Sequence, residues 1–213
     1  KKYLEEFKAL SDLDGGLLGL RTPFARGGFD IAALSSGLAI SAISDVLKGK
    51  YKNSYSLSRP PGHHCLPDYP NGFCLLANIA IAIEYSIKNK LGKKFCVIDW
   101  DVHHGNGTEA IFYNRNDVLT ISIHQERNYP VDTGMETHQG KQEGLGFNVN
   151  LPLPAGSGHQ AYLNVFDRII DPIVSNYSPD IIIVACGFDA AMIDPLSSML
   201  CSAETFRLLT RKA

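Results

Sequence analysis

Short apolar runs alternate along this chain with longer segments whose apolar residues recur every three or four positions. Five of the runs have the length and composition of buried strands. They are residues 55–58, 95–100, 118–124, 147–151 and 181–186. Helical spacing is found over residues 31–48, 75–90 and 159–177. Strands that alternate with helices predict an α/β fold with a parallel sheet covered by helices on both faces.

The ends of the predicted helices carry their own signals. Asp30 is a good N-cap for the helix over residues 31–48, which should end near Gly49. Pro172 lies inside the segment 159–177 and predicts a kink or a break there. Ser202, followed by Glu204, is typical of the start of a last helix.

Composition limits the kinds of partner. The chain has 213 residues, of which 45% are hydrophobic and 20% charged, as in an ordinary globular domain. The net charge of -2 shows no basic excess, so we expect no direct nucleic-acid partner. No uninterrupted apolar run approaches the ~18 residues of a membrane span, so we expect none.

The five cysteines bear on the cellular compartment. Their number is odd and no CxxC pair occurs, which favours reduced thiols and a cytoplasmic location. Cys65 follows two histidines and could be reactive, but a structural thiol is the favoured interpretation.

The most informative segment runs from the apolar residues 95–98 into Asp99, Asp101 and His103. Side chains alternate along a strand, so these three share one face. A carboxylate that begins inside an apolar run is costly unless a cation or a hydrogen-bonding partner compensates it. Carboxylate oxygens and imidazole nitrogens are zinc ligands. The alternative is a strand-end turn whose polar residues face solvent.

A second apolar run, residues 181–186, ends in Gly187 and Asp189. Asp189 could complete an Asp-His-Asp ligand set, with Gly187 giving backbone room. Three protein ligands leave a position open for water and substrate, as a catalytic zinc site requires. Alone, Asp189 would more often be a helix cap or a turn residue.

A further loop carries candidate catalytic residues. A stiff loop contains Pro60, Pro61 and Gly62 and then the tandem histidines His63 and His64, which could supply a general base and acid. An exposed loop with incidental histidines, or two further metal ligands, are the alternatives.

Two aromatic residues could line a substrate channel. Phe73 follows Gly72, and Tyr129 lies in a loop after the run 118–124. If the two rings face each other, they would contact the methylene stem of a lysine or a polyamine from both sides. Phe73 could equally be an ordinary core residue.

Taken together, these segments resemble the arginase–deacetylase superfamily, in particular its zinc-dependent histone deacetylase branch. The Arg-Pro-Pro-Gly-His-His motif and Asn106 resemble the corresponding residues of the class II enzymes and their bacterial relatives. The resemblance runs from about Gly19 to Pro195. It implies a three-layer fold with a parallel sheet of about eight strands between helices.

The resemblance also implies a role for each site residue. Asp101, His103 and Asp189 would bind the catalytic Zn²⁺, and His63 and His64 would be the paired acid/base histidines. Asp99 would orient His63, and Asn106 would stand behind His64. Gly72, Phe73, Tyr129 and Gly187 would line the acyl-lysine tunnel. A structural K⁺ would be held by Asp99, Asp101, His103, Ser122 and Ile123.

Asn106 has a physical consequence. A carboxylate behind His64 would favour its imidazolium form more than an amide does. We therefore expect His64 to stay neutral down to a lower pH than it would with Asp in this position.

One departure from the family pattern matters. The family polarises the substrate carbonyl with a Tyr or His that follows a glycine pair, and no such motif occurs up to Ala213. We therefore expect residues 1–213 to be a single deacetylase domain that lacks its C-terminal portion.

The expected reaction is hydrolysis of an N-acyl amine, with acetyl-lysine in a protein or peptide as substrate. An acetylpolyamine amidohydrolase is the main alternative. A two-manganese arginase-like enzyme needs another carboxylate soon after His103, where Gly105 stands. A zinc-dependent acyl-lysine binder without turnover is the non-enzyme alternative. Acyl length and oligomeric state do not follow from the sequence.

Overall fold

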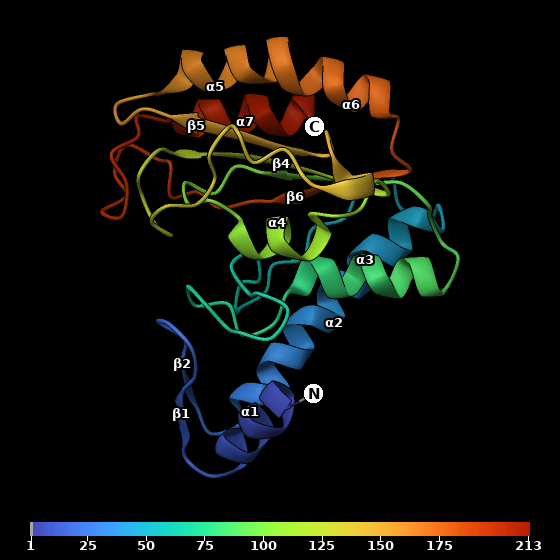
Figure 1. Ribbon diagram of the computed structural model, residues 1–213, viewed down its shortest axis with the longest axis vertical. Coiled ribbons are helices and arrows are strands. Elements are labelled where there is room, and N and C mark those ends of the chain that lie inside the picture. The colour runs from blue at the N-terminus through green and yellow to red at the C-terminus, as the bar shows by residue number, and fades with distance from the viewer. Residues whose placement is uncertain (1) are drawn as a thin grey trace. The chain divides into compact units, whose positions relative to one another are not determined.

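The computed structural model describes residues 2–213, which divide into two compact units (Figure 1). The helical unit comprises Lys1–Gly92 and Asn106–Ile111, and the sheet unit comprises Lys93–Gly105 and Phe112–Ala213. Each unit is compact by itself, and a single domain over residues 1–213 stays a prediction.

The sheet unit is built on four parallel strands. They are β3 (Phe95–Asp99), β4 (Val118–Gln125), β5 (Asn148–Leu153) and β6 (Ile181–Ala185), in the spatial order β5-β4-β3-β6. Four of the five predicted strands are therefore confirmed, together with the parallel α/β class. The expectation of about eight strands is not met within residues 2–213, where this sheet has four.

Three helices cover one side of this sheet (Figure 1). They are α5 (His159–Val165), α6 (Asp171–Tyr177) and α7 (Ala203–Lys212). Tyr162, Phe166 and Leu209 are fully buried in one cluster with strand residues such as Ile98 and Ile121. Each fully buried aliphatic or aromatic side chain contributes about 1.5–3 kcal/mol relative to exposure. β3 is buried at every position, which is why its first four residues are all apolar rather than alternating.

The irregularity predicted at Pro172 is confirmed. A π-helical turn, η2 (Phe166–Ile170), separates α5 from α6, and Pro172 lies in the first turn of α6. Proline lacks an N–H group and its ring clashes with the carbonyl of the preceding turn, so regular α-helical bonding is interrupted there.

The predicted start of the last helix is confirmed as well. Ser202 is the N-cap of α7, and its hydroxyl accepts a hydrogen bond from the Thr205 N–H at 3.4 Å. The Thr205 hydroxyl in turn accepts from the Ser202 N–H at 3.0 Å, so the two residues form a capping box.

The helical unit contains α1 (Lys2–Asp12), α2 (Gly28–Leu47), α3 (Asn78–Lys88), most of α4 (Asn106–Phe112) and a two-stranded antiparallel hairpin. The hairpin strands are β1 (Gly15–Leu17) and β2 (Pro23–Ala25). Phe7 is fully buried and makes edge contacts with Phe24 and Phe29. The hairpin was not predicted, because strands of three residues are too short to show alternation.

Polar contacts join α2 to α3. The Ser36 hydroxyl donates to Asn78 Oδ1 at 2.7 Å, and Asn78 Nδ2 donates to Ser35 Oγ at 3.1 Å. Asn78 Nδ2 also donates to the Pro60 carbonyl at 3.0 Å, so this asparagine fastens the loop that leads to the tandem histidines.

Within residues 2–213, α2 is the one helix long and apolar enough to cross a membrane, with a mean hydropathy of 1.4 over its most apolar window. A core helix of a soluble protein has the same length and composition, so this is weak evidence for a span. The expectation of no membrane span stays a prediction.

Two sequence-based expectations in this unit are wrong. Residues 55–58 form no strand, because Tyr55 and Leu57 are exposed and the polar Ser58 instead accepts a hydrogen bond from Ser35 at 3.1 Å. Asp30 is not the N-cap of α2. The helix begins at Gly28, after Gly27 in a left-handed conformation, so Asp30 lies in its first turn. A carboxylate there still stabilises the helix through the macrodipole.

Candidate metal centre and histidine pair

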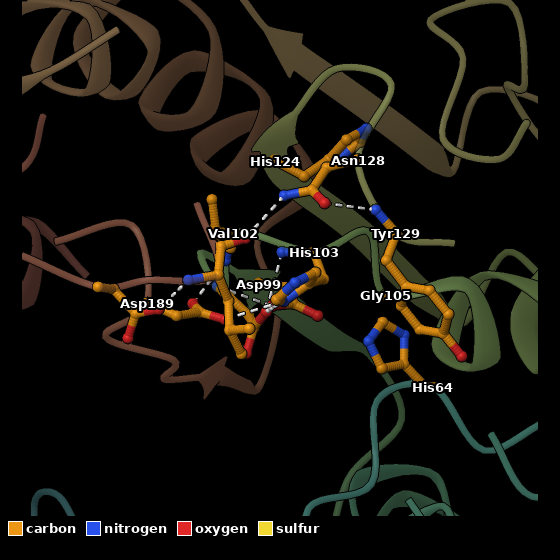
Figure 2. A network of polar contacts seen from close by, with 12 residues as sticks. His64, Asp99, Val102, His103, Gly105, His124, Asn128, Tyr129 and Asp189 are labelled. Atoms are coloured by element: carbon orange, nitrogen blue, oxygen red, sulfur yellow. Dashed lines mark hydrogen bonds and ion pairs between the residues drawn. The ribbon is translucent and has the colours of Figure 1, made fainter. Parts of the chain in front are cut away.

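Asp101, His103 and Asp189 come together in the sheet unit. Figure 2 shows His103 and Asp189 side by side. Their potential ligand atoms all lie within 4.8 Å of one another. Asp101 and His103 follow β3, and Asp189 follows β6, the strand paired with β3. The carboxyl ends of neighbouring parallel strands meet at one edge of a sheet, so the fold itself brings the three side chains together.

Backbone amides orient the two carboxylates. Asp189 Oδ1 accepts a hydrogen bond from the Val102 N–H at 2.8 Å, and Asp101 Oδ1 accepts from the His103 N–H at 2.9 Å. One oxygen of Asp189 is thereby held by the backbone of the β3 loop. Its other oxygen, Oδ2, lies 2.9 Å from His103 Nδ1.

Gly187 makes room for the Asp101 carboxylate. A Cβ atom added to Gly187 would lie 2.3 Å from Asp101 Oδ2 and 2.7 Å from its Cγ. Real Cβ atoms do not approach other atoms this closely, so only glycine fits while Asp101 keeps its place. The expected backbone room at this position is confirmed, and a direct contact of Gly187 with substrate stays a prediction.

The electrostatics of the three side chains fit a cation. Burial alone would lower the pKa of His103, but hydrogen bonds to Asp101 and Asp189 outweigh it and raise the pKa to about 10. Burial of the Asp189 carboxylate raises its pKa, and the nearby charge of Asp101 adds to this increase. Two partly buried carboxylates demand positive charge, which either a proton on His103 or a divalent cation bound by all three groups supplies. The donor set of two oxygens and one nitrogen suits zinc.

Asp99 is the last residue of β3 and lies two positions before Asp101. It is 2% exposed, and its Oδ1 accepts a hydrogen bond from the Asp101 N–H at 3.1 Å. In the sheet it pairs with Ser122 of β4, followed by the buried Ile123. The structure thus brings Asp99 and Ser122 together as the potassium prediction requires, while the ion itself stays a prediction.

The tandem histidines lie in the helical unit. His63 and His64 are both buried, and their ring centroids are 3.9 Å apart. His64 Nδ1 lies 2.8 Å from Asn106 Oδ1, so a neutral imidazole can donate from Nδ1 and keep Nε2 as a proton acceptor. The position of Asn106 behind His64 is therefore confirmed. Since His63 and Asp99 lie in different units, their pairing stays a prediction.

The start of α4 fixes the backbone of this pair. The Gly107 and Thr108 N–H groups donate to the His63 carbonyl at 2.9 and 3.1 Å. The adjacent Cys65 is buried, which raises the pKa of its thiol to about 12. A thiol so reluctant to ionise is a structural residue, as favoured from the sequence.

Phe73 is presented by a strained turn. Asn71 and Cys74 exchange backbone hydrogen bonds across Gly72 and Phe73, and both central residues have positive φ, 52° and 66°. Such a turn suits glycine, but for phenylalanine it costs about 1–2 kcal/mol. The Phe73 ring is 56% exposed, so it is no ordinary core residue. Strain that displays an exposed ring favours the binding role.

Tyr129 lies in the sheet unit, on the loop that follows β4. Its ring meets the ring of His103 edge-on, with centroids 6.2 Å apart. An aromatic ring beside a predicted metal ligand agrees with the predicted place of Tyr129, although its contact with substrate stays a prediction.

A histidine network behind this loop was missed from the sequence. His104 Nδ1 lies 2.9 Å from Thr133 Oγ1, and His124 Nε2 lies 2.9 Å from the Gly134 carbonyl. The two rings are 4.8 Å apart and buried. Thr120, Ser122 and His124, which alternate with apolar residues along β4, were the available signal.

The carboxylate–imidazole cluster thus lies at the carboxyl ends of two adjacent parallel strands, where open α/β sheets bind their ligands. The histone deacetylase domain matches residues 1–213, and the chain belongs to that family.

Relatives and solved structures agree with this assignment. A histone deacetylase-like amidohydrolase of Pseudomonas aeruginosa is 51% identical over 98% of this chain and 55% of its own length. A probable deacetylase of Archaeoglobus fulgidus is 39% identical over 99% of this chain and 59% of its own length. The chain thus spans somewhat more than half the length of these relatives.

Two solved structures have the same fold. The crystal structure of the HDA15 HD domain matches with a TM-score of 0.94 and 34% identity, over 100% of this chain and 62% of that one. An acetylpolyamine aminohydrolase from Burkholderia pseudomallei matches with a TM-score of 0.79 and 36% identity, over 88% of this chain and 54% of that one. The resemblance to the arginase–deacetylase superfamily is confirmed.

Proposed function

We propose that this protein hydrolyses N-acyl amines with a zinc ion, and that acetyl-lysine in a protein or peptide is the substrate. The convergence of Asp101, His103 and Asp189 carries the proposal, because it supplies three ligands of the type that a catalytic zinc site uses. Family membership supports the deacetylase class.

Each residue has a part in the proposed reaction. Asp101, His103 and Asp189 would hold the zinc, which when bound polarises an acyl carbonyl and lowers the pKa of water toward ~7. His64 would accept a proton at Nε2 from the attacking water, while its Nδ1 is hydrogen-bonded to Asn106 Oδ1. A histidine of the pair then gives a proton to the leaving amine.

The remaining predicted residues shape and stabilise the centre. Gly72, Phe73, Tyr129 and Gly187 would line the path of the acyl-lysine stem. A K⁺ held by Asp99, Asp101, His103, Ser122 and Ile123 would balance the buried Asp99 carboxylate. Adding K⁺ in place of Na⁺ should therefore change the zinc affinity, which competition with a chelator measures.

A second candidate substrate is an acetylated polyamine. The similarity to the Burkholderia acetylpolyamine aminohydrolase favours it. A polyamine and a lysine share the amine-bearing methylene stem, so the two are separated by rates rather than by binding chemistry. Comparing kcat/KM for an acetyl-lysine peptide and for acetylspermidine decides between them.

The histidine assignment is tested with His64→Ala in the full-length protein. General acid/base catalysis contributes roughly 10²–10⁴ in rate, so turnover should fall by that factor while the zinc content stays at one ion per chain. His159→Ala is a matched control, because His159 contacts Thr205 near the start of α7 and has no proposed catalytic part. Full activity in the His64 variant would contradict the mechanism.

The metal assignment is tested by elemental analysis and zinc titration of the dialysed protein. We expect one zinc per chain in the wild type and loss of tight binding in Asp189→Asn. Two tightly bound manganese ions would support the arginase-like alternative instead. One zinc and affinity for acetyl-lysine without hydrolysis would support the non-catalytic binder.

We also propose a cytoplasmic location. All five cysteines are free thiols in the described structure, four of them buried, which suits a reducing compartment. Cell fractionation of the native protein tests this.

A further inference from the structure

We propose that Asn128 is a positioning residue that ties the loop carrying Tyr129 to the loop that follows Asp189. The inference rests on the proposed function, because it treats these two loops as parts of the substrate opening. Both loops belong to the sheet unit.

The side-chain amide of Asn128 uses both of its ends. Its Oδ1 accepts a hydrogen bond from the Tyr129 N–H at 2.8 Å, as Figure 2 shows. Its Nδ2 donates to the Leu196 carbonyl at 3.3 Å. One side chain therefore joins the backbones of two segments that lie far apart in the sequence.

A second amide supports the same connection. Gln125, at the end of β4, accepts a hydrogen bond from the Ser198 N–H at 2.8 Å through Oε1. Asp194 Oδ1 accepts from the Leu196 N–H at 2.8 Å, which shapes the turn that presents the Leu196 carbonyl to Asn128. Residues 194–198 are thus held at two points, by the side-chain amides of Gln125 at the end of β4 and Asn128 just after it.

The link joins the backbone of Tyr129 to a segment with an exposed aliphatic side chain. Tyr129, whose N–H Asn128 binds, has its ring against the ring of His103. Leu196 is 57% exposed although it is aliphatic, so its side chain is available to a ligand. Fixing Tyr129 relative to Leu196 would set the width available to an acyl-amine stem and would favour slender acyl groups such as acetyl.

An amide is required for this role because it donates and accepts at once. Asn128→Asp keeps the acceptor for the Tyr129 N–H but loses the donor to Leu196, and it sets a carboxylate against a carbonyl oxygen. This variant isolates the connection between the loops. Asn128→Ala removes both bonds.

The matched control is Asn89→Asp in the helical unit. Asn89 Nδ2 donates to the Tyr85 carbonyl at 2.7 Å, so the same substitution removes the same kind of bond elsewhere. Neither Asn89 nor Tyr85 has a part in the proposed site.

The experiment measures steady-state kinetics and hydrogen exchange on the full-length protein. The loss of one hydrogen bond changes an equilibrium constant by roughly 3- to 10-fold. We expect Asn128→Asp to raise KM for an acetyl-lysine peptide by that factor with kcat nearly unchanged, and to lower the preference for acetyl over butyryl substrate. Amide exchange in residues 194–200 should become faster in Asn128→Asp and stay unchanged in Asn89→Asp.

The possible results separate this inference from the proposed function. Unchanged exchange in residues 194–200 overturns the inference, and so does faster exchange with KM and acyl preference unchanged. A wild-type protein that hydrolyses no acyl amine refutes the proposed function, and the exchange comparison then decides alone whether Asn128 joins the two loops.

Discussion

Replacing Gly187 with Ala should weaken zinc binding at the proposed metal centre while leaving the fold intact. The new Cβ would lie 2.3 Å from Asp101 Oδ2 and 2.7 Å from its Cβ and Cγ. Ordinary contact begins near 3.4 Å. All three close atoms belong to one short side chain, whose position is already fixed by the bond from the His103 N–H.

The size of the effect follows from these distances. Relieving the overlap requires the Asp101 carboxylate to move by about 1 Å, whereas metal–ligand distances are held within about 0.2 Å. Overpacking of this kind costs about 1–3 kcal/mol. If that cost falls on the metal-bound state, zinc affinity drops by about 5- to 150-fold, since 1.4 kcal/mol corresponds to a factor of ten.

Zinc affinity of the dialysed protein, measured by competition with a chromophoric chelator, is the direct assay. Gly37→Ala is the matched control, because a Cβ there meets nothing within 4 Å and Gly37 lies inside α2. Alanine should stabilise the helix at this position by about 0.5–1 kcal/mol. Circular dichroism and thermal unfolding check that both variants fold.

Wild-type zinc affinity in a folded Gly187→Ala protein would refute the reasoning. It would show either that Asp101 is no ligand or that the backbone at residue 187 can retreat. A loss of affinity in Gly37→Ala of similar size would show that the effect is not local to the site.

Three further changes test other parts of the structure. Tyr162→Phe removes a fully buried hydroxyl without a hydrogen-bond partner among residues 2–213, so the free energy of unfolding should rise by about 1–3 kcal/mol in denaturant titrations; a decrease would reveal a partner such as a buried water. Ser202→Ala removes the N-cap of α7 and should lower the same free energy by about 1 kcal/mol, with no change in zinc affinity. Asn106→Asp places a carboxylate beside His64 and favours its imidazolium form, so the acidic limb of the kcat/KM profile should move to higher pH. An unmoved limb would count against His64 as the base.

Features governed by local rules could be predicted from the sequence. Alternation read from residue 95 onward predicted Asp99, Asp101 and His103 on one face, and a carboxylate in an apolar run indicates a cation. Ser202 likewise identifies the start of α7, because capping depends on residues a few positions apart.

Features that depend on distant contacts were not predictable in this way. Nothing in the sequence around Asn128 indicates that its amide reaches Leu196. Tyr55 and Leu57 have the composition of a strand, but whether such a segment pairs depends on what lies beside it in space, and in the structure both residues are exposed. Local propensity cannot supply that information.

Accounting for the proposed metal centre requires both local patterns and the strand order of the sheet. In the order β5-β4-β3-β6, successive strands lie on one side of β3 until β6 returns to its other side. The order in which the chain adds strands therefore changes sides at the junction of β3 and β6. In such sheets, ligands bind beyond the carboxyl ends of the two strands at this switch point. Asp101 and His103 follow the first of these strands and Asp189 follows the last, so residues far apart in the sequence become neighbours because of strand order. Alternation could nominate each predicted ligand singly, but the strand order, which the sequence analysis did not predict, explains why the three side chains form one set.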